Sequence, residues 1–184
     1  MTERTTPRLL LRQWRDTDLD PLAELHADPV VMRYIAAGEP QTREESARSL
    51  ERFRAGWREH GFGLFAAQLR ATGEFVGWVG LAVPDFLPEV LPAVEIGWRL
   101  RRQHWGQGYA TEAAREVLAF GFGELGLDRL VSIYQLPNHA SAHVMEKLGM
   151  VPERRTVSPG NGRAVQVTEL TRADYLARHG ASQS

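Results

Sequence analysis

Apolar side chains recur along this chain at two different spacings, and the spacing predicts which segments form helices and which form strands. Between residues 42 and 60 they recur every three or four residues, which is typical of one buried face of a helix. Thr42 and Glu45 form a capping box, so this helix is expected to begin there. From residue 63 the spacing changes to two, and residues 63–70 and 74–83 are expected to form a β-hairpin.

The same reasoning, extended along the chain, predicts a mixed domain. Strands are expected at residues 8–14, 63–70, 74–83, 94–100, 128–136, 151–157 and 163–170, and helices at residues 19–25, 42–60, 108–125 and 138–148. Residues 29–35 are apolar but match neither spacing, and the segment after residue 181 is expected to be disordered. We therefore expect an α/β (α+β) fold with a mixed, mostly antiparallel sheet of about seven strands and helices on both faces.

Composition is typical of a soluble globular protein, and the length favours one domain, residues 1–184, with an ordered core at about residues 8–178. The 184 residues are 43% hydrophobic and 24% charged. The net charge of -1 gives no support to nucleic-acid binding, and no apolar run approaches the length of a membrane helix. The absence of cysteine excludes disulfides and thiolate chemistry, and suits a cytoplasmic protein.

Two glycine motifs are distinguished by the elements around them. Gly121, Gly123 and Gly126 have the spacing of a dinucleotide fingerprint, but they end a predicted helix and lead into a strand, the reverse of what that motif needs. Gly106 and Gly108 follow a predicted strand and precede a predicted helix, which is the correct order. However, no Gly-Lys-Ser/Thr follows them to form a nucleoside-triphosphate loop. Free amides at a helix N-terminus bind phosphate groups, so this turn is predicted to hold a phosphate or pyrophosphate.

The sequence around this turn resembles the acyl-CoA-binding motif of the GNAT N-acetyltransferases. Gln103, Gly106 and Gly108 match its Arg/Gln-x-x-Gly-x-Gly/Ala pattern. The string Trp-Gly-Gln-Gly-Tyr-Ala-Thr-Glu-Ala at residues 105–113 is similar to the RimJ/RimL-like branch, which acetylates the N-termini of ribosomal proteins. A second block at residues 138–150, Asn-His-Ala-Ser-Ala-His-Val-Met-Glu-Lys-Leu-Gly-Met, matches the same branch. The resemblance covers nearly the whole chain and implies acetyl-CoA as the acyl donor.

The resemblance also implies which residues bind coenzyme A. The backbone amides at about residues 105–110 are expected to hold its pyrophosphate, and Asn138 to contact the pantetheine arm, a role compatible with capping a helix. Arg101 and Arg102 either add phosphate contacts or are simply solvated. The complete set implied for acetyl-CoA is Ile96, Gly97, Trp98, Arg101, Arg102, Gln103, Trp105, Gly106, Gln107, Gly108, Tyr109, Ala110, Asn138 and Ser141.

Glu95 and Ser141 are the predicted catalytic residues. By the resemblance, Ser141 protonates the departing thiolate; many GNAT enzymes have a tyrosine acid where this chain has Met145, so Ser141, Tyr134 or water must serve. Glu95 is the expected general base, because it would point into the cleft from the strand and partial burial would raise its pKa. The alternative is a structural ion pair with an arginine. The strand amides at residues 96–98 would stabilise the oxyanion if a bulge splays them.

These residues together predict an N-acetyltransferase that moves an acetyl group from acetyl-CoA to a primary amine by direct attack in a ternary complex. The acceptor is left open between a peptide N-terminus, a polyamine and another small-molecule amine. The rival interpretations are a non-catalytic acyl-CoA sensor or assembly module, and a dinucleotide-dependent oxidoreductase. His139 and His143 are four residues apart but lack a third ligand, so no metal site is expected.

Several apolar and aromatic residues have two possible roles. The exposed-looking residues Phe86, Leu87, Val90 and Leu91 indicate either a homodimer contact or a wall of the acceptor cleft. Other aromatic side chains are expected either to line that cleft or to belong to the core; together with Phe86 they are Trp14, Tyr34 and Phe62.

Overall fold

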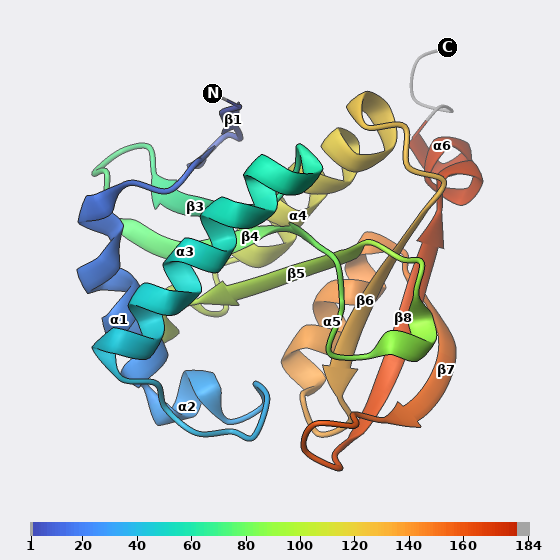
Figure 1. Ribbon diagram of the computed structural model, residues 1–184. Coiled ribbons are helices and arrows are strands. Elements are labelled where there is room, and N and C mark those ends of the chain that lie inside the picture. The colour runs from blue at the N-terminus through green and yellow to red at the C-terminus, as the bar shows by residue number, and fades with distance from the viewer. Residues whose placement is uncertain (1, 180–184) are drawn as a thin grey trace.

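The computed structural model describes residues 2–179, whose helices and strands are labelled in Figure 1. The strands are β1 (Arg4–Thr5), β2 (Leu9–Arg12), β3 (Leu64–Leu69), β4 (Phe75–Ala82), β5 (Glu95–Leu100), β6 (Arg129–Gln135), β7 (Val151–Val157) and β8 (Ala164–Thr171). The helices are α1 (Leu19–Ala27), α2 (Pro29–Met32), α3 (Arg43–His60), α4 (Tyr109–Ala119), α5 (His139–Leu148) and α6 (Arg172–His179). The segment after residue 181 lies outside the described residues.

The strands form one sheet of eight, in the order β1-β2-β3-β4-β5-β6-β8-β7. Every neighbouring pair is antiparallel except β5 and β6, which run parallel and share a single backbone bridge, between Glu95 and Val131. Beyond that bridge the two strands diverge (Figure 1). The expected mixed, mostly antiparallel sheet is therefore confirmed, and its one parallel junction opens the sheet near its middle.

Helices cover both faces of this sheet (Figure 1). Helix α4 packs on one face, where Val117 joins Ile96 of β5 in the largest buried cluster. Helices α1 and α3 pack on the other face, where Leu25 and Leu50 join Trp78 of β4 in a second buried cluster. Because side chains alternate along a strand, successive residues of β5 face these two layers in turn.

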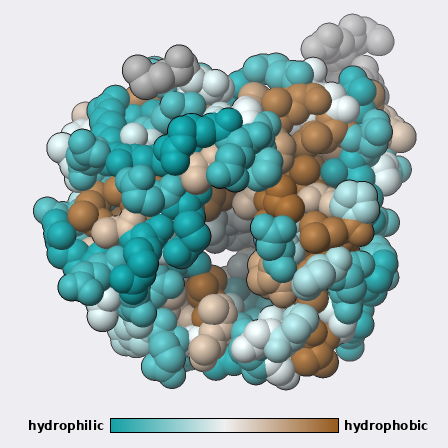
Figure 2. Space-filling model, viewed as in Figure 1, coloured by the Kyte–Doolittle hydropathy of each residue, from teal (hydrophilic) through white to brown (hydrophobic). Residues whose placement is uncertain are grey.

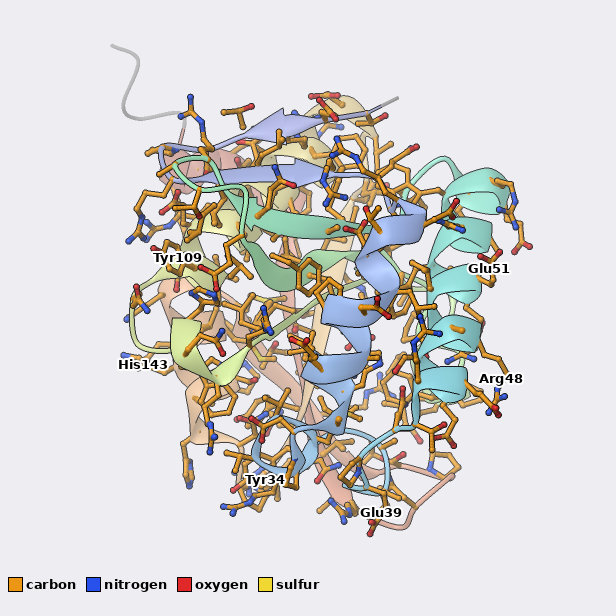
Figure 3. The ribbon with its side chains drawn as sticks, turned by 90° about the vertical axis from the view of Figure 1, so that its left-hand side faces the viewer. Tyr34, Glu39, Arg48, Glu51, Tyr109 and His143 are labelled. Atoms are coloured by element: carbon orange, nitrogen blue, oxygen red, sulfur yellow. The ribbon has the colours of Figure 1, made fainter. Side chains whose placement is uncertain are left out.

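Helix α3 begins and ends where the sequence predicts. The Glu45 amide donates to Thr42 Oγ1 at 3.2 Å, and the Thr42 amide donates to the Glu45 carboxylate at 2.7 Å. Gly61 ends the helix in the left-handed conformation, with φ of 73°. Its charged outer side faces solvent, and Arg48 and Glu51 point away from the sheet there (Figure 3).

The element boundaries differ from the predicted ones in four places. Strand β1 is an eighth strand, and its two residues are too few to produce a periodic pattern. Residues 29–32 form the short helix α2, which the Asp28 carboxylate caps by accepting the Val30 amide at 2.8 Å. Helix α4 stops being regular at Ala119, because a π-helical turn, Phe120–Glu124, follows it. Helix α6 follows β8 directly and is not among the predicted helices.

The element order also bears on the interpretations that compete with acyl-CoA binding. Gly121 and Gly123 lie in the π-helical turn and Gly126 in the loop before β6, so the glycine triplet follows a helix and precedes a strand. A dinucleotide fingerprint requires the opposite order. No helix within residues 2–179 is long and apolar enough to cross a lipid bilayer.

Candidate active site

A cavity of about 590 Å³ lies where β5 and β6 diverge. Figure 2 shows a hollow at the centre of this face of the molecule, between the side that carries α1 and α3 and the side that carries β6 to β8. Strand β5, strand β6, the start of α5 and the segment after α2 supply its walls. The lining residues used below are Tyr34, Trp78, Phe86, Glu95, Gly97, Trp98, Arg99, Tyr134, Asn138, Ser141 and Met145.

Glu95 lies at the first position of β5 and lines the cavity, as the sequence predicts. Its neighbour Ile96 is fully buried on the opposite face, against α4. Removal from water raises the pKa of the Glu95 carboxyl to about 8, partly offset by a hydrogen bond from the backbone amide of Ile133. Among the described residues Glu95 has no arginine partner, so the alternative of a structural ion pair does not apply.

The backbone of β5 faces the opening at alternate residues. The Arg101 amide donates to the Val76 carbonyl at 2.9 Å, so residues 97, 99 and 101 face β4 and residues 96, 98 and 100 face β6. The Trp98 amide therefore points into the diverging part of the sheet. The register between β4 and β5 is continuous, so β5 lacks the bulge on which the oxyanion role of these amides was made conditional. The opening arises instead because β6 leaves β5 after one bridge.

The start of α5 brings Asn138 and Ser141 to the same cavity. The Asn138 side chain accepts the Ser141 amide at 3.2 Å and so caps the helix, as expected, while also lining the cavity. Met145, one turn further, is buried, and its sulfur accepts a hydrogen bond from Thr168 Oγ1 at 3.4 Å. Tyr134 of β6 also lines the cavity, so both hydroxyls considered as proton donors, those of Ser141 and Tyr134, are there.

The turn between β5 and α4 has the geometry of an anion cradle. Gly106 and Gly108 adopt positive φ values of 73° and 81°, which only glycine adopts readily. A methyl group on Gly106 would meet no atom within 4 Å, so the turn faces open space there. No side chain caps α4, and the amides of Tyr109, Ala110 and Thr111 have no acceptor within the helix. These free donors fit the diphosphate of coenzyme A.

The arginines before the turn are engaged by acids of the α1 region. Arg101 forms an ion pair with Glu24 of α1, and Arg102 Nε lies 3.4 Å from the Asp28 carboxylate. Neither arginine is needed to explain an anion site, because the turn provides backbone donors of its own. Their predicted phosphate contacts stay predictions.

Side chains within the turn hold its shape. Gln107 Nε2 donates to the Gln103 carbonyl at 2.9 Å, and Trp105 Nε1 donates to the Leu100 carbonyl at 2.8 Å. Trp105 nevertheless remains 44% exposed. Gln103, Trp105 and Gln107, all predicted to bind coenzyme A, therefore support the turn through these bonds.

Arg8 is a residue beside this turn that the sequence analysis did not connect with it. Its guanidinium donates to the Gln107 carbonyl at 2.9 Å, lies over the Tyr109 ring at 4.4 Å, and pairs with Glu112 of α4 at 2.6 Å. It lines a second cavity, of about 680 Å³, together with Gly108. No local pattern links residues so far apart in sequence, so the chain's sequence contains no direct signal for this contact.

The apolar and aromatic residues divide between cavity and core. Tyr34 and Phe86 line the cavity, and Phe86 is 51% exposed. Leu87 and Val90, expected to be exposed, are instead buried, because they pack against β6 and β8. Trp14 belongs to the buried cluster under α1 and α3, and Phe62 packs against the other cluster, under α4.

Comparison with known proteins places this architecture in a single class. Residues 8–151 match the family described as an acetyltransferase (GNAT) domain. A Bacillus subtilis protein, YkkB, which has no described function, is 38% identical over 157 residues that cover 81% of this chain and 85% of that protein. The FsC-acetyl coenzyme A-N(2)-transacetylase of Aspergillus fumigatus is 37% identical over 132 residues, 69% of this chain and 55% of that enzyme.

Solved structures agree on the fold. An acetyltransferase from Agrobacterium tumefaciens superposes with a TM-score of 0.77 at 28% identity, covering 91% of this chain and 94% of that one. A spermidine N-acetyltransferase from Vibrio cholerae, solved with CoA and spermine, gives a TM-score of 0.74 at 20% identity, covering 91% and 98%. The fold and the site thus define an acetyl-CoA-dependent acetyltransferase. This chain belongs to the GNAT family of acetyltransferases.

Proposed function

We propose that this acetyltransferase moves the acetyl group of acetyl-CoA to a primary amine by direct attack, with Glu95 as the general base. The observation that carries the proposal is that Glu95 and Ser141 line one cavity at the point where β5 and β6 diverge. Acetyl-CoA and the amine would meet there in a ternary complex, so the enzyme contributes positioning as well as proton transfer.

The donor is proposed to bind along the turn at residues 105–110 and the start of α4. The free amides of Tyr109, Ala110 and Thr111 would hold the diphosphate, and the open front of Gly106 leaves room for it. Arg8, beside the same turn, would add positive charge. Asn138, at the start of α5, would contact the pantetheine arm on its way to the cavity.

Glu95 suits the task of a base because its pKa matches that of the amine. A protonated α-amine titrates near 7.7 to 8.0 and a lysine amine near 10.4, so the nucleophile must lose a proton. Burial raises the pKa of Glu95 to about 8, which makes the carboxylate a far stronger base than an exposed glutamate. It accepts the proton directly or through one water molecule, and the Trp98 amide stabilises the oxyanion of the tetrahedral intermediate.

The departing thiolate is proposed to take its proton from Ser141. A thiol of pKa about 8.5 is a good leaving group and needs only modest assistance. The Ser141 hydroxyl makes no hydrogen bond to another described residue, because only its backbone amide is used in capping, so it is available to donate. Tyr134 lies in the same cavity and is the second candidate.

The sequence blocks and the named relatives point to different classes of acceptor. The blocks at residues 105–113 and 138–150 favour the RimJ/RimL-like branch, and a Bacillus subtilis relative named as a ribosomal N-acetyltransferase is 30% identical over 87 residues. The Vibrio enzyme is instead named for spermidine, a small-molecule amine. A cavity of about 590 Å³ favours a small-molecule amine or the first residue of a peptide.

The test is acetyl-CoA-dependent release of free thiol across a panel of amines, with wild type and Glu95→Gln. The substitution is expected to lower kcat by about a hundredfold or more, because general base catalysis is lost. The dissociation constant for acetyl-CoA should not change. Glu51→Gln, on the outer side of α3, is the matched control and should keep full activity. An unchanged rate in Glu95→Gln would show that Glu95 is not the base. If neither the wild type nor the variants acetylated any amine of the panel, the result would favour an acyl-CoA sensor.

A further inference from the structure

Among the residues that line the cavity between β5 and β6, only two are acidic or basic, Glu95 and Arg99. Both belong to β5, four residues apart, and therefore point to the same face of the sheet. At about 3.3 Å of rise per residue their Cα atoms lie roughly 13 Å apart. They form no ion pair with each other, so the cavity has a carboxyl group at one place and a positive group at another.

Arg99 is half-buried, and its Nε is a fully buried donor with no acceptor among residues 2–179. Its neighbour across the ladder, Trp78 of β4, has a buried indole N–H that also has no acceptor. The guanidinium carbon lies 5.0 Å from the Trp78 ring centre, which gives a cation–π contact but satisfies no donor. Two neighbouring side chains of the cavity wall thus present unsatisfied donors.

Among the described residues, no acidic side chain pairs with Arg99 or shifts its pKa. His26 of α1 is close enough for the charge of Arg99 to affect it, and its Nε2 is a third buried polar atom without a partner. Burial and the charges of Arg99 and Arg52 lower the pKa of His26 to about 3, so it is neutral. Of the four such orphaned atoms among the described residues, three therefore belong to this one group around Arg99.

A half-buried cation without an acidic partner is costly, and arginine cannot escape the cost by losing its proton near neutral pH. Burial lowers the pKa of Arg99 to about 10, which still leaves it charged at pH 7. A buried charge is normally paired and hydrogen-bonded. The planar fork of a guanidinium matches a carboxylate, which accepts two parallel hydrogen bonds from it.

We propose, resting on the function proposed above, that the acceptor is an amine that also carries a carboxylate, as an amino acid does. Arg99 and the Trp78 indole N–H would bind the carboxylate, and this would direct the amine toward Glu95. A polyamine fits this cavity poorly, because its second ammonium would meet Arg99. A protein N-terminus fits poorly as well, because an amide stands where the free carboxylate would be.

The experiment measures kcat/KM for matched pairs of acceptors with saturating acetyl-CoA. The probes are α-amino acids and ω-amino acids of increasing length, each paired with its own carboxamide, and spermidine. The wild type is expected to prefer the carboxylate of a matched pair by about tenfold or more, since a charge-assisted bidentate contact is lost in the amide. The preferred chain length reports the separation of the two binding groups.

Three variants assign the preference to the proposed residues. Arg99→Gln should abolish the preference for the carboxylate while leaving turnover of the carboxamide and the affinity for acetyl-CoA nearly unchanged. Trp78→Phe, which keeps an aromatic ring and removes the indole N–H, should reduce the preference for the carboxylate in part. Arg48→Gln, on the outer side of α3, is the control and should behave as the wild type. The melting temperature of each variant verifies that it is folded.

The outcomes separate this inference from the proposed function. Turnover of amines without preference for carboxylates, or an equal loss for both members of a pair in Arg99→Gln, overturns the inference and leaves the acetyltransfer standing. If no acceptor is acetylated, the carboxylate site is tested by ligand binding instead. N-acetyl amino acids together with CoA must then raise the melting temperature of the wild type more than that of Arg99→Gln. Absence of that difference overturns the carboxylate site, whereas failure to bind acetyl-CoA overturns the function.

Discussion

Glu95 is a carboxylate whose chemistry is set by its position at the start of a central strand. On β5 it alternates with Ile96, which packs under α4, so its own side chain must enter the cavity. Desolvation there raises its pKa to about 8. The same burial that makes it a useful base also makes its charged form unfavourable to the folded protein, and this has a measurable consequence.

Glu95→Gln is expected to stabilise the protein at alkaline pH. Between the unfolded pKa near 4.5 and the folded pKa of about 8, the folded state holds a proton that the unfolded state has lost, so wild-type stability falls as pH rises. Glutamine does not titrate, so the melting temperature of the variant should exceed that of the wild type by several degrees above pH 8, and by much less below about pH 5. Thermal unfolding across this pH range measures it. A difference that does not change with pH would contradict the raised pKa.

Single residues differ in how far sequence alone could predict their roles. Glu95 and Ser141 were identified from motif and strand pattern, and the structure brings both to one cavity. Arg99 shares the face of Glu95 by simple alternation, yet nothing in the sequence indicates that it lacks an acidic partner. That property depends on side chains of α1, α3 and β4, which only the folded chain brings together.

At the scale of elements, the turn before α4 is proposed to bind the donor through its backbone. Gly106→Ala adds a methyl group at the open front of the turn and strains a positive φ of 73°. The matched control is Gly61→Ala at the end of α3, which also has φ of 73° and no atom within 4 Å of the added methyl. Both variants should lose similar stability, of about 1 kcal/mol.

Only Gly106→Ala should weaken the binding of acetyl-CoA, because its methyl group occupies the space proposed for the diphosphate. The dissociation constant should rise by about tenfold or more. Titration calorimetry on the two variants makes the comparison. Equal affinities for acetyl-CoA in Gly106→Ala and Gly61→Ala would mean that the donor does not approach this turn.

A second element that shapes the site is the segment 33–38, which follows α2 and forms one wall of the cavity. Ala36 adopts a positive φ of 44°, unusual for a residue with a side chain, so the segment is held in place from outside. Arg163, in the turn between β7 and β8, donates to the Arg33 carbonyl at 3.1 Å and to the Ala37 carbonyl, and Asn161 donates to the Ala36 carbonyl at 2.6 Å.

Arg163→Met is therefore expected to loosen this wall. KM for the amine should rise several-fold, while the dissociation constant of acetyl-CoA stays the same, because the diphosphate of the donor is proposed to bind at the turn before α4, away from this segment. Arg154→Met, on β7, is the control, since Arg154 is exposed and, within residues 2–179, forms its ion pair with Glu153 alone. Steady-state kinetics with the amine varied would reveal the change, and an unaltered KM would argue that the segment needs no such tie.

The elements themselves were largely predictable because their signals are local. The capping box at Thr42, the cap at Asn138 and the left-handed glycines at residues 61 and 149 all lie where the pattern indicates. The misses have local causes too: β1 is two residues long, and the π-helical turn after α4 keeps helical spacing while changing the hydrogen bonding.

At the scale of the whole molecule, function depends on the divergence of β5 and β6. One bridge, between Glu95 and Val131, joins the two halves of the sheet. Beyond this bridge the strands separate, and the cavity in the opening is lined by residues of β5, β6 and α5. No periodicity predicts how far two strands stay paired. The sequence led to this arrangement only through resemblance to the GNAT family, and the opening arises without the bulge in β5 on which the oxyanion role was made conditional.

The most direct test of the account compares the binding of acetyl-CoA with that of S-acetylpantetheine, which has the same thioester but lacks the diphosphate and the nucleotide. Titration calorimetry on the wild type is predicted to give one-to-one binding of acetyl-CoA, at least about a hundredfold tighter than that of S-acetylpantetheine, because the free amides of α4 hold the diphosphate. No detectable binding of acetyl-CoA at about 1 mM, or equal affinities for the two thioesters, would contradict it.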